Sequence, residues 1–162
     1  MKFSIIHIEA LSGPKAKVYS LKYEDKTISE LQSFIYKFQD SDPGVIHKAV
    51  QRIHLISKRD GIQDSFFLRE SSESHNIFRL LETDRLRLYC IMFSNIFLLF
   101  GSGGKKKDKT KKNVENPHLE KEIKKLMLVE DLINARLDSG ELKITCDGFV
   151  GELNDFILQG SV

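Results

Sequence analysis

The sequence has no tryptophan, only three prolines and only two cysteines among its 162 residues. Cys90 and Cys146 form no CxxC pair, and two cysteines are too few for a disulfide-stabilised scaffold or a cysteine-based zinc site. No apolar run reaches the roughly 18 residues that a membrane-spanning helix needs. The first residues lack the apolar segment of a secretory signal. We therefore expect a protein of a reducing compartment, the cytoplasm, with no membrane partner.

What the sequence contains is typical of a globular protein, with 41% hydrophobic residues, 30% charged residues and eleven phenylalanines. A chain of this length buries roughly two-thirds of its unfolded surface, so a single hydrophobic core is feasible. The formal net charge is only +2, but the charges are unevenly distributed. Residues 105–112 hold six lysines and one aspartate, whereas residues 141–162 hold four acids and one lysine. The net charge by itself neither requires nor excludes a nucleic-acid partner.

The spacing of apolar residues predicts an α+β fold. Apolar residues at every second position indicate strands, and apolar residues at every third or fourth position indicate helices. The expected strands cover residues 2–8, 16–24, 76–81, 85–93 and 95–101. The expected helices cover residues 30–39, residues from Pro43 to Gly61, and residues from Pro117 to Gly140. We expect a twisted, mostly antiparallel sheet packed against an N-terminal helical hairpin, followed by a C-terminal helix and a short extension.

Individual residues mark where these elements begin and end. Ser29 and Asp42 precede helices and are expected to cap them. Pro43 occupies the first helical position, where its missing N–H costs nothing. The pair Ser94–Asn95 is suited to a tight hairpin turn, and Gly140 to a helix C-terminus.

The chain divides at Gly140 into a main domain, residues 1–140, and a C-terminal extension, residues 141–162. The extension contains apolar side chains throughout, including Leu142, Phe149 and Phe156. Such a segment is too apolar for a solvated tail. We expect it to pack on the body of the protein or to contact a partner.

Motifs for nucleophilic, nucleotide-binding and metal chemistry are missing from the sequence. Neither cysteine has a histidine at a suggestive spacing, and no G-x-S-x-G motif occurs. The stretch GSGGKKK lacks the spacing of a Walker loop. His47 and His54 lie two turns apart on one predicted helix, too far to share a metal without further ligands. We expect no metal and no cofactor.

Basic side chains accompany the three predicted strands of the second half. Arg79 lies in the first strand, Arg85 and Arg87 lie in the second, and Lys105–Lys107 follow the third. If the strands are antiparallel neighbours, short connections bring these six groups to one end or face of the sheet. Such a cluster can bind phosphate and stabilise the negative charge that develops during RNA cleavage. Alternatively, these groups are solvated and keep the surface soluble.

Short segments also follow one another in a characteristic order. After the two predicted helices come Phe66–Arg69, Ile77–Leu81, Leu86–Tyr89, Ile96–Gly101 and Gly104–Lys106, and then the helix at Pro117. This succession resembles the RelE/ParE superfamily of toxins of type II toxin–antitoxin systems, most closely its phage-derived, HigB-like branch. The resemblance covers roughly residues 16–138 and lies in the order and spacing of the segments.

The resemblance implies a small α/β domain over residues 1–140 and an activity. Most relatives are ribosome-dependent mRNA endonucleases that need no metal, in which a ribose 2′-OH attacks the adjacent phosphate; the 2′-OH makes RNA the substrate. Arg79 and Arg87 match the catalytic arginines of the family. The residues expected to bind RNA are Arg69, Arg85, Lys105, Lys106 and Lys107. The implied partners are mRNA on the ribosome and a cognate antitoxin with a helix-turn-helix fold.

The sequence departs from the family pattern at two places. Leu86 stands where an aromatic residue is usual, and Gly103–Gly104 stand where an apolar–aromatic pair is common. No residue is a clear general base, because His118 and Tyr89 are candidates by type alone. Without a suitable proton acceptor, the reaction loses about 10²- to 10⁴-fold in rate.

Two other functions are compatible with the same sequence: a ParE-like toxin that inhibits DNA gyrase, and a catalytically inactive adaptor with the same fold. The acidic extension could also fold over the lysine run and regulate it in cis. The nuclease hypothesis requires Arg79, Arg87 and Lys105 to converge in one hollow. Internal ion pairs, or side chains that point in unrelated directions, would remove its basis.

Overall fold

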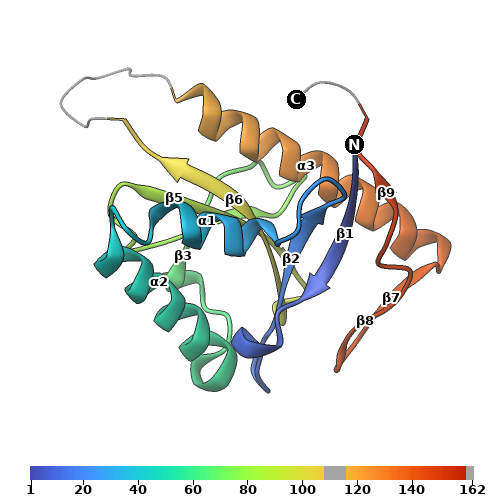
Figure 1. The fold of residues 1–162 in the computed structure, drawn as a ribbon. Coiled ribbons are helices and arrows are strands. Elements are labelled where there is room, and N and C mark those ends of the chain that lie inside the picture. The colour runs from blue at the N-terminus through green and yellow to red at the C-terminus, as the bar shows by residue number, and fades with distance from the viewer. Residues whose placement is uncertain (108–115, 160–162) are drawn as a thin grey trace.

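A computed structural model describes residues 1–107 and 116–159 of the chain (Figure 1). The strands are β1 (Lys2–His7), β2 (Lys17–Tyr23), β3 (Phe67–Arg69), β4 (Ile77–Leu80), β5 (Leu86–Phe93), β6 (Phe97–Lys105), β7 (Leu142–Thr145), β8 (Gly148–Gly151) and β9 (Phe156–Ile157). The helices are α1 (Glu30–Phe38), α2 (Pro43–Leu55), which continues as a π-helical turn (Ile56–Asp60), and α3 (Pro117–Ser139). The prediction of an α+β fold is confirmed.

Seven strands form one mixed sheet in the order β3-β4-β5-β6-β2-β1-β9, and β7 pairs with β8 in a separate hairpin. β1 and β2 are antiparallel neighbours, as are β3 to β6 in succession. β2 and β6 are parallel, because a long crossover that includes α1 and α2 separates them along the chain. The first strand and the last one, β9, are antiparallel partners at one edge.

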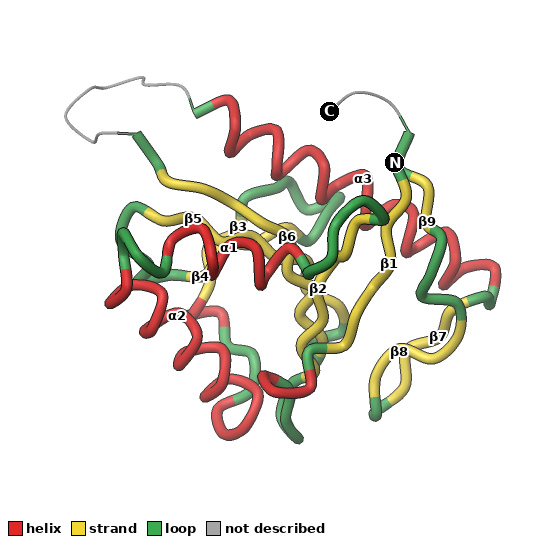
Figure 2. Tube along the Cα trace, in the orientation of Figure 1, coloured by secondary structure: helices red, strands yellow, loops and turns green. Residues whose placement is uncertain are grey.

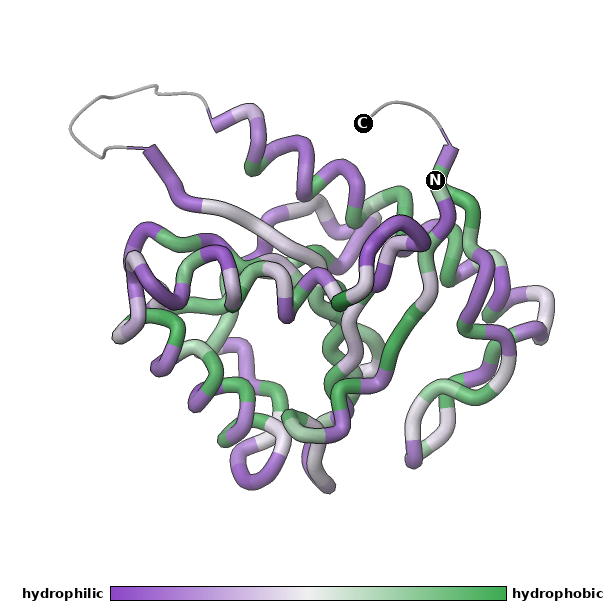
Figure 3. The backbone as a smooth tube through the Cα atoms, viewed as in Figure 1, coloured by the Kyte–Doolittle hydropathy of each residue, from purple (hydrophilic) through white to green (hydrophobic). Residues whose placement is uncertain are grey.

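Helices cover both faces of the sheet (Figures 1 and 2). α1 and α2 lie on one face and share a core with Leu86, Leu88 and Cys90 of β5. α3 lies on the other face and shares a second core with Tyr89 and Ile91. Successive residues of β5 therefore enter two different cores, as strand geometry requires. Along α3, most residues of the first turns are hydrophilic (Figure 3).

Most of the residues predicted to cap helices or to form a turn do so in the structure. The Ser29 hydroxyl accepts a hydrogen bond from the Gln32 N–H at 3.2 Å and caps α1. Ser94 and Asn95 both have positive φ angles, 54° and 58°, as the central residues of a type I′ hairpin turn do. Asp42 occupies the N-cap position of α2, as predicted, but it does not cap the helix through its side chain. Its side chain makes no capping bond to α2; the carboxylate accepts hydrogen bonds from Ser41 and Lys105.

The glycine-rich stretch belongs to β6 rather than to a loop, so the strand extends beyond the expected end at residue 101. A methyl group on Gly101 would lie 2.8 Å from Leu126 Cδ2, and one on Gly104 would lie 2.9 Å from the His118 ring. The absence of side chains here lets α3 approach the strand closely. These glycines therefore fix the position of α3 over the sheet.

The extension forms the β7–β8 hairpin and then the edge strand β9. Leu142, Phe149 and Phe156 are buried in the core beneath α3. Arg136 of α3 holds the connection to β9, because its guanidinium donates hydrogen bonds to three carbonyl oxygens, those of residues 152, 154 and 155. Within the described part of the chain, no helix is both long enough and apolar enough to cross a membrane.

Candidate functional site

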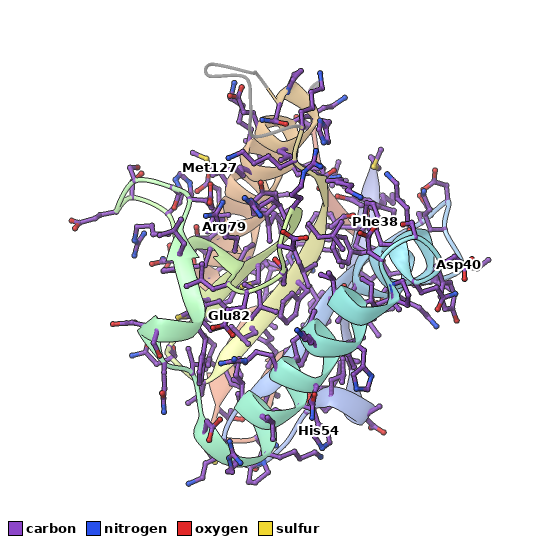
Figure 4. The ribbon with its side chains drawn as sticks, turned by 90° about the vertical axis from the view of Figure 1, so that its left-hand side faces the viewer. Phe38, Asp40, His54, Arg79, Glu82 and Met127 are labelled. Carbon is purple, nitrogen blue, oxygen red and sulfur yellow. The ribbon has the colours of Figure 1, made fainter. Side chains whose placement is uncertain are left out.

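Arg79 and Arg87 lie on the same face of the sheet. Arg79 alternates with Phe78 and Leu80, which face α1 and α2, and Arg87 alternates in the same way with Leu86 and Leu88. Both arginines therefore face the side of α3. Arg79 pairs with Tyr89 across β4 and β5, so Arg87 is its diagonal neighbour. Figure 4 shows Arg79 on the side of Met127 of α3 and away from Phe38 of α1.

Each of these arginines has an internal partner. Arg79 Nε lies 3.4 Å from Glu70 Oε1, with about a quarter of the Arg79 side chain exposed (24%). Arg87 is 9% exposed, and its Nη1 donates hydrogen bonds to the carbonyl oxygens of Asp84 and Leu86. Burial and the positive charge of Arg79 lower the Arg87 pKa, although a guanidinium remains charged at neutral pH. The two cations are close enough to repel each other.

Glu70 is the residue of this site that the sequence analysis missed. It follows β3, and its N–H donates to the Ile77 carbonyl at 2.8 Å, which continues the pairing of β3 with β4. The preceding Arg69 lies over Phe78 on the α1 and α2 side, so strand alternation directs Glu70 to the face of Arg79. The three-residue strand is too short for a periodicity signal, but a carboxylate adjacent to a predicted site arginine could have been considered.

Tyr89 lies beneath this group and is 2% exposed. Burial and then the negative charge of Glu70 raise the Tyr89 pKa to about 12, while Arg87 and Arg79 act in the opposite direction. The phenol is therefore protonated at neutral pH and is a poor proton acceptor. His118 lies elsewhere, with Nε2 3.1 Å from the Lys105 carbonyl oxygen.

Lys105 lies on the opposite face of the sheet, so the expected convergence of Arg79, Arg87 and Lys105 does not occur. Lys105 pairs with Leu86, whose side chain enters the core beneath α1 and α2. Lys105 Nζ lies 3.3 Å from Asp42 Oδ1, and this ion pair contributes, after the Ser41 hydrogen bond, to lowering the Asp42 pKa. Lys105 is thus held at the start of α2.

A bulge in β6 is the physical reason for this difference. Leu88 pairs with Gly103 and Cys90 with Phe100, so β6 has one residue more than β5 between these pairs. One extra residue reverses which side chains face each side of a strand. Without it, Lys105 would share the face of Gly101 and α3.

The remaining predicted residues also lie outside the group around Arg79. The Arg69 guanidinium stacks 4.7 Å from the Phe78 ring centroid and donates to the His75 carbonyl. Arg85 Nη2 donates to the Lys106 carbonyl at 3.2 Å. The Lys107 N–H donates to Asn116. Residues 108–112 of the lysine run lie outside the described residues. The structure thus brings together two of the seven predicted site residues and adds a carboxylate.

Residues 1–107 and 116–159 contain no group of three histidine, cysteine or acidic side chains that could hold a metal ion. No family model, curated protein or solved structure matches this chain. The function of the chain is therefore inferred from the chemistry of the site and from the resemblance to the RelE/ParE toxins.

Proposed function

We propose that the protein is a toxin of a type II toxin–antitoxin system that cleaves mRNA on the ribosome, and that Glu70, Arg79 and Arg87 carry the chemistry. The observation that supports this proposal is that a carboxylate and two guanidinium groups lie on one face of adjacent strands. Relative to the RelE/ParE toxins, α1 and α2 would be the N-terminal helical hairpin, and the active surface would be the part of the opposite sheet face that carries Glu70 and Arg79, which are partly exposed beside the core under α3.

In this proposal the Glu70 carboxylate accepts the proton of the attacking 2′-OH. The 2′-oxygen forms a bond to phosphorus as the bond to the 5′-oxygen breaks, and the departing 5′-oxygen receives a proton through water. Arg79 and Arg87 bind the non-bridging phosphate oxygens, where negative charge increases in the transition state. The 3.4 Å contact between Arg79 and Glu70 would open when a phosphate enters.

The convergence of Arg79, Arg87 and Lys105 that the sequence-based form of this hypothesis requires does not occur, and Arg79 and Lys105 each form an ion pair. That form of the hypothesis is therefore abandoned, and the present proposal depends on the smaller group of Glu70, Arg79 and Arg87. Lys105 would have no role in the chemistry, because it lies on the other face and is paired with Asp42. Dependence on the ribosome and neutralisation by a helix-turn-helix antitoxin are carried by the resemblance alone. The ribosome would supply the orientation of the RNA strand, which two arginines cannot fix by themselves.

The second candidate is a catalytically inactive adaptor with the same fold. It is favoured by the internal partners of the two arginines, since Arg79 pairs with Glu70 and Arg87 donates to backbone carbonyls. Arginines with such partners can be purely structural. In that case, substitution of Arg87 would change the stability of the fold without changing RNA cleavage.

The test is a reconstituted translation reaction with a defined mRNA, followed by mapping of the RNA ends. We expect wild-type protein to produce discrete cuts only when ribosomes are present, and Arg87→Lys to reduce them at least tenfold while remaining folded. Arg59→Ala is the matched control, because Arg59 is exposed and pairs with the neighbouring Asp60. Intact mRNA would contradict the proposal; inhibited DNA supercoiling by gyrase would then indicate the ParE-like alternative.

A further inference from the structure

A groove of about 580 Å³ lies between α3 and the edge strand β9. Its walls include Leu128, Asp131, Leu132 and Arg136 of α3, together with Asp155 and Ile157 beside or within β9. The two walls come from the last helix and the last strand of the chain (Figure 2). The volume falls within the usual range for sites that bind small ligands or peptides.

One wall of this groove is an edge of the sheet, where no further strand pairs with β9 among residues 1–107 and 116–159. β9 is the terminal strand of the sheet, with β1 on its inner side. Met1 and Leu158 exchange hydrogen bonds across these strands, through the terminal ammonium and the Leu158 N–H. In an antiparallel pair, the adjacent residue, Ile157, directs its N–H and C=O away from the partner strand. Within the described part of the chain these two groups have no backbone partner, so another extended chain could pair with them.

The opposite wall offers an apolar surface to such a chain. Leu128 of α3 is a large hydrophobic residue, but 40% of its surface is exposed. Leu132 lies one turn beyond Leu128 on the same face of α3. An inserted apolar side chain would remove these surfaces from water, which is the main favourable contribution to peptide binding.

The charged residues of the groove indicate which charge a bound peptide should carry. Asp131 and Asp155 line the groove. Asp131 Oδ1 lies 2.9 Å from His75 Nε2, but 61% of the Asp131 side chain remains exposed. Arg136 is the cation among the lining residues, but its Nη1 and Nη2 already donate to the carbonyls of residues 152, 154 and 155. The carboxylates therefore favour a cationic side chain in the occupant.

We propose that the groove between α3 and β9 binds an extended segment of a partner protein in which a lysine or arginine adjoins an apolar residue. The segment adds to β9 as a further strand, pairs with the backbone of Ile157, and inserts its apolar side chain beside Leu128. The inference is independent of the proposed RNA chemistry, because the residues of the two sites are different.

A second copy of this chain is a less suitable occupant. β9 contains only two residues, Phe156 and Ile157. A stable interface between folded proteins buries about 1,600 Å², and a groove of this size and so short an edge offer little of that area. A single extended strand needs only backbone hydrogen bonds and one or two side-chain contacts.

The test uses an array of synthetic hexapeptides with alternating apolar and polar residues. Each peptide with lysine or arginine beside the central apolar residue has two analogues, one with glutamate in place of the basic residue and one with an N-methylated backbone. We expect the strongest basic peptide to bind the full chain with a Kd below about 1 mM, and both analogues to bind at least fivefold more weakly. NMR should locate the bound basic peptide at Ile157, Leu128 and Leu132.

Substitutions in the groove then test whether the peptide binds there. Leu128→Glu should abolish binding, and Asp155→Lys should weaken binding of the basic peptide and improve binding of its glutamate analogue. Val150→Glu is the matched control, since Val150 is also an exposed apolar residue but lies on β8, outside the groove. Failure of every peptide to bind, equal binding of the glutamate analogue, or perturbations elsewhere would overturn the proposal. So would a dimer in sedimentation that Ile157→Lys dissociates, because the groove would then hold a second copy.

Discussion

Replacement of Glu70 by glutamine separates the proposed chemistry from folding and from RNA binding. The amide keeps the size of the side chain, and its oxygen can occupy the place of Glu70 Oε1, which lies 3.4 Å from Arg79 Nε. It cannot accept a proton from a 2′-OH. A missing general base costs about 10²- to 10⁴-fold in rate, whereas the loss of a partly exposed ion pair should lower the free energy of unfolding by no more than about 1 kcal/mol.

The assay is single-turnover cleavage of an mRNA on the ribosome, with RNA affinity measured in parallel by fluorescence anisotropy. We expect Glu70→Gln to cleave at least 100-fold more slowly and to bind RNA as well as or better than wild type. The reason for the second expectation is that the substitution removes a carboxylate that repels phosphate. Glu73→Gln is the control, because Glu73 is exposed and lies three residues away in the same loop.

Two results would refute this reasoning. If Glu70→Gln cleaves at the wild-type rate, the carboxylate is not the proton acceptor. If the variant unfolds or loses RNA affinity together with activity, Glu70 has a structural role and the rate carries no information on proton transfer.

Three further substitutions test buried polar groups on the α3 side of the sheet, each by urea unfolding. Glu130→Ala should lose about 3 kcal/mol, since the buried carboxylate accepts hydrogen bonds from both the backbone N–H and the side-chain amide of Asn76. Tyr19→Phe should lose about 1–2 kcal/mol, because the Phe149 N–H then lacks its 2.9 Å acceptor inside the core. Burial raises the Tyr23 pKa from 10.0 to about 12. Because the unfolded chain then loses this proton at lower pH than the folded chain, the free energy of unfolding of the wild type should fall by up to about 1.4 kcal/mol per pH unit between these two values. Tyr23→Phe should lessen this fall.

Two substitutions on the surface serve as controls. Asp131→Ala follows Glu130 directly but removes an exposed carboxylate, and should change the free energy of unfolding by less than about 1 kcal/mol. Tyr36→Phe removes an exposed hydroxyl and should be nearly neutral. Equal losses in variant and control would show that the buried hydrogen bonds do not determine stability. For Tyr23, stability that is constant above pH 10 would contradict the direction of the shift.

The sequence predicts the longer elements well because their periodicity extends over several turns or pairs. The helix expected over residues 30–39 is α1 (Glu30–Phe38), and the strand expected over residues 85–93 is β5 (Leu86–Phe93). Both have apolar residues at regular spacing and clear boundaries. β3 and β9 were not predicted, because strands of three and two residues contain less than one full alternation of each face.

In the candidate site, too, the sequence predicts side-chain positions only where strand alternation is regular. The common face of Arg79 and Arg87 follows from alternation along two regular strands, which a sequence can indicate. The position of Lys105 could not be predicted in this way, because a bulge beside Gly103 shifts the alternation in β6 by one residue. Glycine carries no side chain that would reveal such a shift, and the stretch reads equally well as a loop.

The position of this bulge changes what the site can bind, and salt distinguishes the alternatives. Six converging cations would follow a polynucleotide backbone, and the logarithm of affinity would then fall with the logarithm of salt concentration with a slope of about −4. Arg79 and Arg87 alone neutralise at most two phosphates, which gives about −1.4 for a single strand. Glu70 beside Arg79 lowers the net charge of the site further. We therefore expect a slope no steeper than about −1.4 in anisotropy titrations with RNA lacking ribosomes. A slope near −4 would mean that residues other than these two arginines, the lysine run first among them, carry most of the binding.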